Sequence, residues 1–349
     1  MILIKQQKNK YKINDMNETN KESFLERSLL VGENSEIYLH RALTVLRNEG
    51  LNPFVTYEIQ ARDGGILCGI NQIIDILEHV LPESDSDVWA LSDSTEISKN
   101  EVVLRIKSKY SNFGLYETSM LGILSSCSGW ATSANRCAVA AEGIPVVSFA
   151  ARAVHPSVAA HVDYSAITGG CSAISSIIGG KITQTTPSGT MPHSLVLIMG
   201  DTVRAALAFD RHIEKNVPRV VLVDTFKDEV EEALEVSRRL KGTLRGIRIE
   251  TPIERGGITP HLVDEIRIKL DYENFEEIDI YVSGDLQPDD IRNFVKNGSK
   301  VGGFAIDNYI ARGSGITFAG DIKEIDGKSI ARRGRKPGVT SSSRLNRVL

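Results

Sequence analysis

From residue 144 to residue 306 the chain alternates short apolar segments with amphipathic ones, and this alternation restricts the fold more than any other feature. Five segments rich in Val and Ile predict strands, and four segments with apolar residues at helical spacing predict helices. Strands and helices that alternate with a period of about 25 to 30 residues predict parallel strands joined by right-handed crossovers. The predicted strands cover 144–149, 220–225, 244–250, 278–283 and 301–306, and the predicted helices cover 156–169, 228–236, 260–270 and 288–295.

Two α/β folds fit this pattern, an open doubly wound sheet and a closed barrel. Nearly every predicted strand ends in a polar pair, as strands do at the carboxyl-terminal mouth of an α/β barrel. We therefore favour a barrel domain over residues 126–317. These polar pairs lie at 224–225, 250–251, 283–284 and 307–308.

The region before the barrel has a different pattern. Helical patterns over 35–48 and 69–80 and a strand-rich part over 88–107 predict an N-terminal α/β domain that covers 21–125. We expect that the C-terminal segment 318–349 can rejoin this domain. The polar residues 1–20 predict a loose N-terminal extension.

Composition excludes several classes of function. The net charge is only −4 and neither half is strongly basic, so small molecules rather than nucleic acids are the expected partners. No apolar run reaches the roughly 20 residues that span a bilayer, and the polar N-terminus does not resemble a signal peptide. The four cysteines form no CxxC pair, which predicts reduced thiols, no structural zinc and a soluble cytoplasmic protein. They are Cys68, Cys127, Cys137 and Cys171.

Three acidic residues lie at or directly after the ends of predicted strands, namely Asp224, Glu250 and Asp307. Because parallel strands end at one edge, these carboxylates could hold Mg²⁺, bind ribose hydroxyls or stabilise a positive charge. The alternative interpretation is that each one caps the next helix. The residues alone leave both interpretations open.

Two further strand ends could bind anions. Ser283-Gly284 precedes a helix opened by Pro288, and free N–H groups there could bind a phosphate, although Asp285 would repel it unless its side chain turns away. Arg152 follows another strand and could bind a carboxylate or phosphate, or simply lie at the surface.

Two histidines and a basic run are ambiguous. His193 follows a loop rich in Pro and Gly, and it is either packed as a core residue or presented at the mouth as a nucleophile or an acid/base group. His155 directly precedes Pro156 and could serve only as a cap. The basic run 332–336 is either solvated or a source of positive charge for the site.

Six segments together resemble the nicotinate phosphoribosyltransferases, and the archaeal-type members most of all. The resemblance extends from about Glu36 to Gly338, and its Tyr-Glu-Thr and Gly-Thr-Met-Pro-His motifs are quite specific to that family. The segments are 110–122, Arg152 with 155–156, 189–193, 223–225, 248–252 and 282–284.

The resemblance implies a type II phosphoribosyltransferase with an N-terminal α/β domain and an incomplete α/β (TIM-like) barrel. Such enzymes form homodimers or higher homo-oligomers whose active sites are shared between subunits. Nicotinate displaces pyrophosphate from phosphoribosyl pyrophosphate, with assistance from substrate-bound Mg²⁺, and gives nicotinate mononucleotide for NAD salvage. ATP would be the co-substrate.

The resemblance also implies roles for individual residues. ATP would phosphorylate His193, Tyr38 of the partner subunit would stack on the base, and Arg152 would face the carboxylate of the base. Asp224 and Glu250 would join His193 as catalytic residues beside a developing oxocarbenium-like charge. The other expected substrate-binding residues are Tyr116, Thr190, Arg248, Ser283, Gly284 and Gly303.

The chain departs from the family pattern in the expected phosphate and base pockets. Ala153 replaces a second arginine, Glu250 replaces an aspartate and Asp285 replaces a glycine, while Ala305 and Ile306 lie where the family has a phosphate-binding Gly-rich strand end. These changes support a non-catalytic or regulatory homologue as one alternative. A transferase for another base, such as quinolinate, is a second alternative, but its two carboxylates would need more cations around Arg152 than this sequence supplies.

Overall fold

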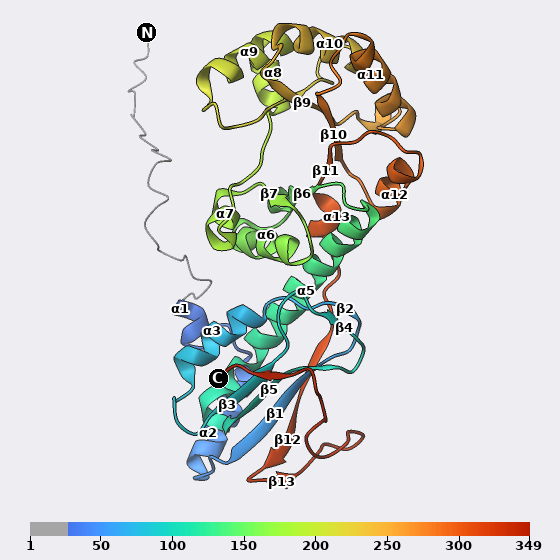
Figure 1. Ribbon diagram of the computed structural model, residues 1–349. Coiled ribbons are helices and arrows are strands. Elements are labelled where there is room, and N and C mark those ends of the chain that lie inside the picture. Colours follow the sequence, from blue (N-terminus) through green and yellow to red (C-terminus); the bar gives the residue numbers. More distant parts are fainter. Residues whose placement is uncertain (1–26) are drawn as a thin grey trace, which may run out of the picture.

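The computed structural model describes residues 27–349, so the predicted loose extension over 1–20 lies outside the described residues. The chain forms two lobes, and the helix α5 (Glu117–Ala140) runs between them (Figure 1). The domain boundary expected between residues 125 and 126 falls inside this helix. The helix packs against α3, β2 and β12 of the first lobe and against α6, α12 and α13 of the second.

The N-terminal lobe is built on a six-stranded sheet in the order β13-β12-β1-β5-β3-β14, with antiparallel neighbours. Because β12 pairs with β1 and β14 with β3, the chain beyond residue 317 returns to this lobe and adds three strands to its sheet. Helix α3 packs its buried isoleucines in the same core as β1 and β5. The elements are α1 (Arg27–Leu30), α2 (Ile37–Asn48), β1 (Phe54–Ala61), β2 (Gly65–Ile66), α3 (Ile70–Val80), β3 (Asp87–Ala90), β4 (Glu96–Ile97), β5 (Val102–Lys109), α4 (Tyr110–Phe113), β12 (Phe318–Ile325), β13 (Lys328–Ser329) and β14 (Asn346–Arg347).

The second lobe contains six parallel strands in the order β7-β6-β11-β10-β9-β8. Each strand lies beside the next one in sequence, except that β7 and β8 are the two edges, and β11 returns to pair with β6. This is the strand order of a barrel that stays open between β7 and β8, so the predicted incomplete barrel is confirmed. The strands are β6 (Val146–Ser148), β7 (Ala173–Ile174), β8 (Arg219–Leu222), β9 (Leu244–Ile249), β10 (Asp279–Gly284) and β11 (Gly303–Ile306).

Helices follow the strands and form the outer layer of this lobe (Figure 1). The predicted strands and helices of the barrel are confirmed, with bounds that differ by a few residues. No helix in the described range, residues 27–349, is long and apolar enough to cross a membrane. The helices are α6 (Ala159–Thr168), α7 (Ile177–Thr183), α8 (His193–Met199), α9 (Thr202–His212), α10 (Glu229–Arg239), α11 (Pro260–Tyr272), α12 (Pro288–Lys296) and α13 (Asn308–Ala311).

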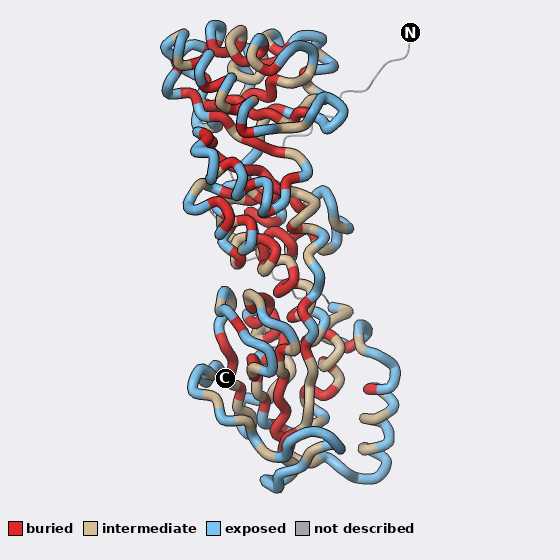
Figure 2. Tube along the Cα trace, turned by 90° about the vertical axis from the view of Figure 1, so that its right-hand side faces the viewer, coloured by how far each residue is buried: buried red, intermediate tan, exposed pale blue. Residues whose placement is uncertain are grey.

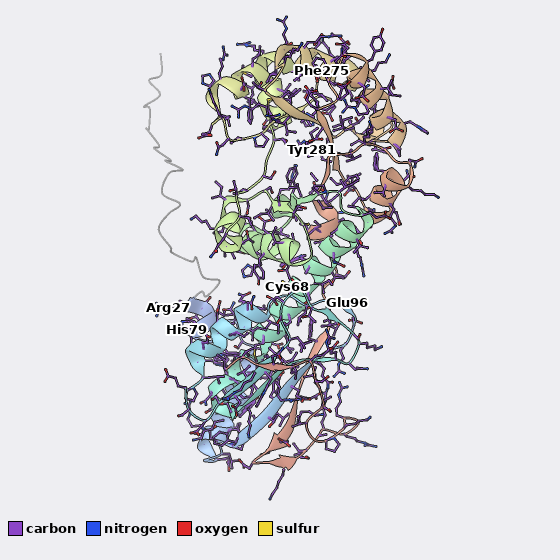
Figure 3. All side chains as sticks on the ribbon, in the orientation of Figure 1. Arg27, Cys68, His79, Glu96, Phe275 and Tyr281 are labelled. Carbon is purple, nitrogen blue, oxygen red and sulfur yellow. The ribbon has the colours of Figure 1, made fainter. Side chains whose placement is uncertain are left out.

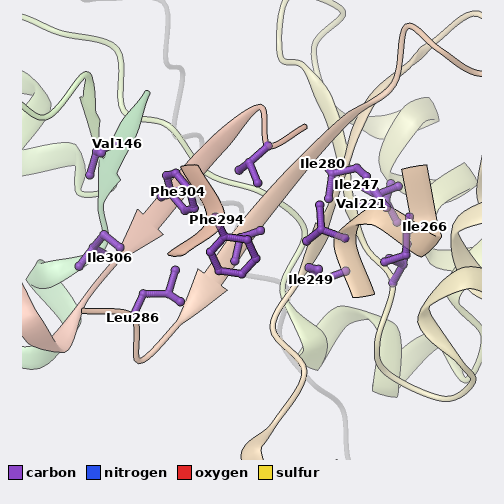
Figure 4. Close-up of a cluster of buried hydrophobic side chains, with 14 of the residues drawn as sticks. Val146, Val221, Ile247, Ile249, Ile266, Ile280, Leu286, Phe294, Phe304 and Ile306 are labelled. Carbon is purple, nitrogen blue, oxygen red and sulfur yellow. The ribbon is translucent and has the colours of Figure 1, made fainter. Parts of the chain in front are cut away.

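The barrel core lies between the strands and these helices. Val221, Ile247 and Ile280 of neighbouring strands pack near Ile266 of α11, and Phe294 of α12 packs on Phe304 of β11 (Figure 4). Strands β8 and β11 are buried at every position, and their sequences are therefore largely apolar. Buried residues run through the interior of both lobes (Figure 2).

Helix α5 is the main element that hydrophobic periodicity does not predict. Its sequence is rich in Ala, Ser, Gly and Cys around the whole circumference, so no apolar stripe marks one face. Small residues allow neighbouring segments to approach closely on several sides. At Gly129, for example, an added Cβ would lie 2.5 Å from the carbonyl oxygen of Ser314.

Candidate functional site

The carboxyl ends of the parallel strands bring most of the expected site residues to one edge of the barrel. Asp224 follows β8, Glu250 follows β9, and Ser283 and Gly284 end β10. Arg152 lies just beyond β6, in a short 3₁₀ turn over Ala150–Ala153. Parallel strands place these loops at the same end of the sheet, which is where α/β barrels hold their active sites.

His193 lies at this edge and is not packed as a core residue. It is the first residue of α8, whose N-cap is Pro192, and its side chain is 39% exposed. Its Nδ1 lies 3.1 Å from Oγ1 of Thr225, and its Nε2 lies 3.7 Å from Oδ1 of Asp224. Of the two interpretations open in the sequence, the structure supports the one with His193 at the mouth.

Asp224, the carboxylate beside His193, is almost fully buried. Its side chain is 1% exposed, and Oδ2 accepts a hydrogen bond from the backbone N–H of Glu250. Oδ1 has no hydrogen-bond partner among the described residues. Burial raises the pKa of Asp224, while that hydrogen bond and the nearby His193 act in the opposite direction. Ionisation of this carboxylate therefore costs free energy in the folded protein, and one of its oxygens remains available to a ligand or to a charged imidazole.

Arg248, Glu250 and Ser283 form a connected group beside Asp224. Arg248 Nη2 lies 3.5 Å from Glu250 Oε2, and the Ser283 hydroxyl lies 3.2 Å from the same oxygen. The Arg248 guanidinium also stacks over the Phe149 ring at 5.6 Å. Its Nε has no hydrogen-bond partner in the described chain, so a donor remains available at the edge.

Arg152 adds a second cation near this group. Its side chain is exposed and no ion pair with it is found among the described residues. Burial lowers the pKa of Arg248, and the charge of Arg152 lowers it further. Arg152 therefore adds positive charge to the same edge as Arg248.

Two buried glutamates of α10 hold the site loops, and sequence reasoning missed them. Glu232 accepts hydrogen bonds from the backbone N–H groups of residues 225, 226 and 227, and Glu229 accepts one from the Thr251 hydroxyl. Each loop carries a site carboxylate, so these glutamates fix the positions of Asp224 and Glu250. The sequence does contain a sign of this role, because both glutamates fall on the apolar face of the helix together with Ala233 and Val236.

The remaining strand-end acids do not join the cluster. Asp307 accepts a hydrogen bond from the Asn308 N–H and caps α13, so the capping interpretation is confirmed for it. Asp285 lines a polar cavity of about 220 Å³ together with Arg136 of α5 and Arg312. His155 caps the turn at Pro156–Val158 through a hydrogen bond from the Ser157 N–H.

Three expected binding residues lie away from this edge in the same subunit. Tyr38 is exposed on α2, and Tyr116 is buried in the N-terminal lobe with its hydroxyl donating to the Leu30 carbonyl. Gly303 begins β11 and therefore lies at the opposite end of the strand, against the ring of Tyr281, which Figure 3 labels in the barrel lobe.

The other expected residues can be placed as well. Thr190 lies in the loop before α8, and its buried hydroxyl has no partner among the described residues. Gly284 has φ of +117°, a conformation that other residues rarely adopt, so its backbone shapes the turn after β10. The basic run 332–336 lies on the N-terminal lobe, where Arg332 and Arg335 pair with Asp321.

Family models match most of the chain. The model described as "Quinolinate phosphoribosyl transferase, N-terminal domain" matches residues 38–128, and the model for the C-terminal domain of the same family matches residues 130–307. The two matches follow the two lobes, and the second includes every site residue at the barrel edge.

Individual relatives with similar sequences are also named as phosphoribosyltransferases. Nicotinate phosphoribosyltransferase pncB2 of Mycobacterium tuberculosis is 28% identical over 243 residues, which are 69% of this chain and 50% of that protein. The nicotinate phosphoribosyltransferase of Bacillus subtilis is 26% identical over 219 residues, or 61% of this chain and 43% of that protein. The chain thus matches about half the length of these relatives.

Solved structures share the fold. The nicotinate-nucleotide pyrophosphorylase from Pyrococcus furiosus is 34% identical, with a TM-score of 0.83 over 90% of this chain and 81% of that one. Human nicotinic acid phosphoribosyltransferase is 16% identical, with a TM-score of 0.71 over 87% of this chain and 77% of that one, and supports the fold alone.

Proposed function

The chain belongs to the type II phosphoribosyltransferase family of quinolinate and nicotinate transferases, and from this premise we propose that it is a nicotinate phosphoribosyltransferase. It would transfer 5-phosphoribosyl from phosphoribosyl pyrophosphate to nicotinate, with ATP as co-substrate. The products would be nicotinate mononucleotide and pyrophosphate, as in NAD salvage.

The observation that carries this proposal is the contact of His193 with Asp224 and Thr225 at the barrel edge. The buried carboxylate orients the half-exposed imidazole beside it. A ring nitrogen of His193 can then accept the terminal phosphoryl group of ATP, and ADP leaves. The carboxylate also stabilises the positive charge that the substituted ring carries.

The number of cations favours nicotinate as the base. Arg248 is already paired with Glu250, so Arg152 is the exposed cation available to a carboxylate of the base. Nicotinate has one carboxylate and quinolinate has two. The description of the matched family model keeps quinolinate as the second candidate.

The acidic residues suit the chemistry of the transfer. The pyridine nitrogen of nicotinate forms a bond to the anomeric carbon of the ribose while the bond from that carbon to pyrophosphate breaks. Asp224 and Glu250 place negative charge near the oxocarbenium-like carbon, and the donors of Ser283 and Arg248 are positioned for ribose or phosphate oxygens.

We propose that Mg²⁺ arrives bound to the substrate and neutralises the leaving pyrophosphate. In the part of the chain that the structure describes, no group of three His, Cys, Asp or Glu side chains could hold a metal ion. We further propose that the enzyme is a homodimer or higher homo-oligomer. Tyr38 is exposed and lies away from the edge in its own subunit, which supports a role for it in the site of a partner.

One assay tests the proposal. The purified protein is incubated with phosphoribosyl pyrophosphate, Mg²⁺ and ATP and with nicotinate, quinolinate or nicotinamide, and mononucleotide products are separated by chromatography. We expect product from nicotinate, formed faster with ATP. Product from quinolinate alone would replace the proposal with the second candidate, and no product from a folded protein would favour a non-catalytic homologue.

A further inference from the structure

An aromatic ring reaches across the barrel to one of the site arginines. Phe149 directly follows β6, whereas Arg248 lies in β9, and the sheet places β11 and β10 between these two strands. The guanidinium carbon of Arg248 nevertheless lies 5.6 Å from the centre of the Phe149 ring, over its face. Ile247 and Ile249 are buried in the barrel core, so alternation along β9 directs Arg248 to the other face of the sheet. The contact is therefore made across the inner face of the open barrel.

Packing of the barrel core does not account for the position of this ring. Phe149 is half-buried, and within the described residues it does not belong to the cluster of side chains between the strands and the helices. Its backbone N–H donates to the Ile306 carbonyl at 2.7 Å, which fixes the end of β6 on β11. The next four residues form the turn that carries Arg152. One short segment thus supplies both the ring and the exposed cation of the edge.

A second arginine in this lobe shows the same contact in a structural role. The guanidinium carbon of Arg219 lies 5.9 Å from the centre of the Phe209 ring. The Arg219 side chain also donates five hydrogen bonds, to the Asp210 carboxylate and to the carbonyls of residues 210, 213, 214 and 217. Its donors hold the segment before β8, so no ligand is needed to satisfy them.

Arg248 differs from Arg219 because its donors are not used in this way. Its side chain is only 10% exposed, its Nη2 lies 3.5 Å from Glu250 Oε2, and its Nε has no hydrogen-bond partner among the described residues. Burial lowers the pKa of Arg248, because a charged guanidinium loses solvation there. A contact with a ring face holds the guanidinium through its charge and leaves N–H donors for a ligand. The ligand that suits these donors is an anion.

We propose that Phe149 is a positioning residue, which holds the Arg248 guanidinium in place for the phosphate groups of phosphoribosyl pyrophosphate. This role rests on the proposed function. A guanidinium of fixed orientation can donate to two oxygens of one phosphate, whereas a mobile one would turn toward the carboxylates of Asp224 and Glu250. Phe149 acts through Arg248, and the base is left to Arg152.

Titration calorimetry with phosphoribosyl pyrophosphate and Mg²⁺, without nicotinate, tests this role independently of turnover. Phe149→Leu removes the ring face and should weaken binding about tenfold, the upper size of a desolvated cation–π contact. Phe149→Tyr keeps the face and should bind within about twofold of wild type. Phe209→Leu is the matched control, because it removes the ring beside Arg219, and it should leave the affinity unchanged. Phe149→Met gives the same test if Phe149→Leu does not fold.

A double-mutant cycle separates positioning from direct contact. In an Arg248→Gln background, Phe149→Leu should change the affinity less than about twofold, because the ring has no guanidinium left to hold. A tenfold loss in both backgrounds would show that Phe149 acts by itself and would overturn the proposal. So would a Phe149→Tyr variant as weak as Phe149→Leu.

The binding data also separate this inference from the proposed function. If wild type binds phosphoribosyl pyrophosphate and Phe149→Leu binds it equally well, the positioning role is wrong and the proposed function stands. If wild type does not bind phosphoribosyl pyrophosphate at all, both are wrong.

Discussion

The two halves of the barrel edge use the same kind of residue in different ways. After β8 and β9, Asp224 and Glu250 are connected to His193, Arg248 and Ser283 by short polar contacts. After β10 and β11, Asp285 lines a cavity beside α5, and Asp307 caps a short helix. All four acids look alike in the sequence as polar residues at strand ends. Their neighbours in space differ, since α8 and α10 surround the first pair and α5 and α13 the second, and these neighbours decide which acids join the polar cluster around His193.

The largest effect is expected at Asp224. Asp224→Asn keeps an oxygen that can accept from the Glu250 N–H but removes the charge beside His193, so the turnover rate should fall about 100-fold or more. The thermal midpoint at neutral pH should rise by about 2 to 4 °C, because burial raises the pKa of Asp224 and its ionisation therefore destabilises the folded state. Steady-state kinetics and calorimetry measure the two effects.

The sign of the stability effect fixes its pH dependence. A carboxyl whose pKa is raised on folding favours the folded state at low pH and loses that contribution as pH rises through the folded pKa. The advantage of Asp224→Asn should therefore be present at neutral pH and disappear below the ordinary value of 3.8. Asp307→Asn is the matched control in the other half of the edge and should keep nearly full activity. A fall in activity as large as that of Asp224→Asn would remove the distinction between the two halves.

His193→Ala should remove the stimulation by ATP, which we expect to be about tenfold. The imidazole is partly exposed, and its contacts with Asp224 and Thr225 are polar, so the thermal midpoint should change little. Rates with and without ATP, together with acid-labile phosphate on the protein, measure the effect. His155→Ala is the control, because His155 lies beyond β6 at the same edge and only caps a turn. A large loss of stability in His193→Ala would support a packing role instead.

A smaller gain is expected from Ala153→Arg. Ala153 is exposed beside Arg152, so an arginine there has room, and under the proposed function it adds a second guanidinium for the carboxylate of the base. The KM for nicotinate should fall about three- to fivefold, the size of one exposed ion pair. Ala153→Gln adds a side chain of similar reach without charge and should leave KM unchanged. If both variants lower KM equally, charge is not the reason.

The sequence predicted five of the six parallel strands of the barrel, because these strands and the helices that follow them satisfy local rules, but it did not predict β7 or the helices α7, α8 and α9. The run before Asp224 is β-branched and buried, and Asp228 caps the helix that follows it. It did not predict α5, because small residues on all its faces leave no periodic signal. The contact between His193 and Asp224 was also beyond local rules, since it depends on the path of a loop that returns to the edge from β7.

Two other misjudged features have equally physical causes. Gly303 was expected near phosphate, but β11 begins at that residue, so the strand itself separates it from the carboxyl edge. The buried Glu229 and Glu232 were overlooked because acidic residues on a helix are usually solvated, and only the loops they hold reveal their role.

The smallest effect is expected at Asp285, and it tests whether the second half of the edge is free of catalytic function. The sequence alone suggests that this carboxylate excludes phosphate, in which case Asp285→Gly would tighten binding of phosphoribosyl pyrophosphate. In the structure the side chain lines a cavity with Arg136 and Arg312, whose charges oppose its own. Removing it should therefore change the affinity less than about twofold, because exposed charges are well screened. Calorimetric titration at two salt concentrations measures this, with Asp289→Gly as a control for an exposed acid on the neighbouring helix. A tenfold gain specific to Asp285→Gly would show that the carboxylate faces the phosphate after all, and that both halves of the edge act on the substrate.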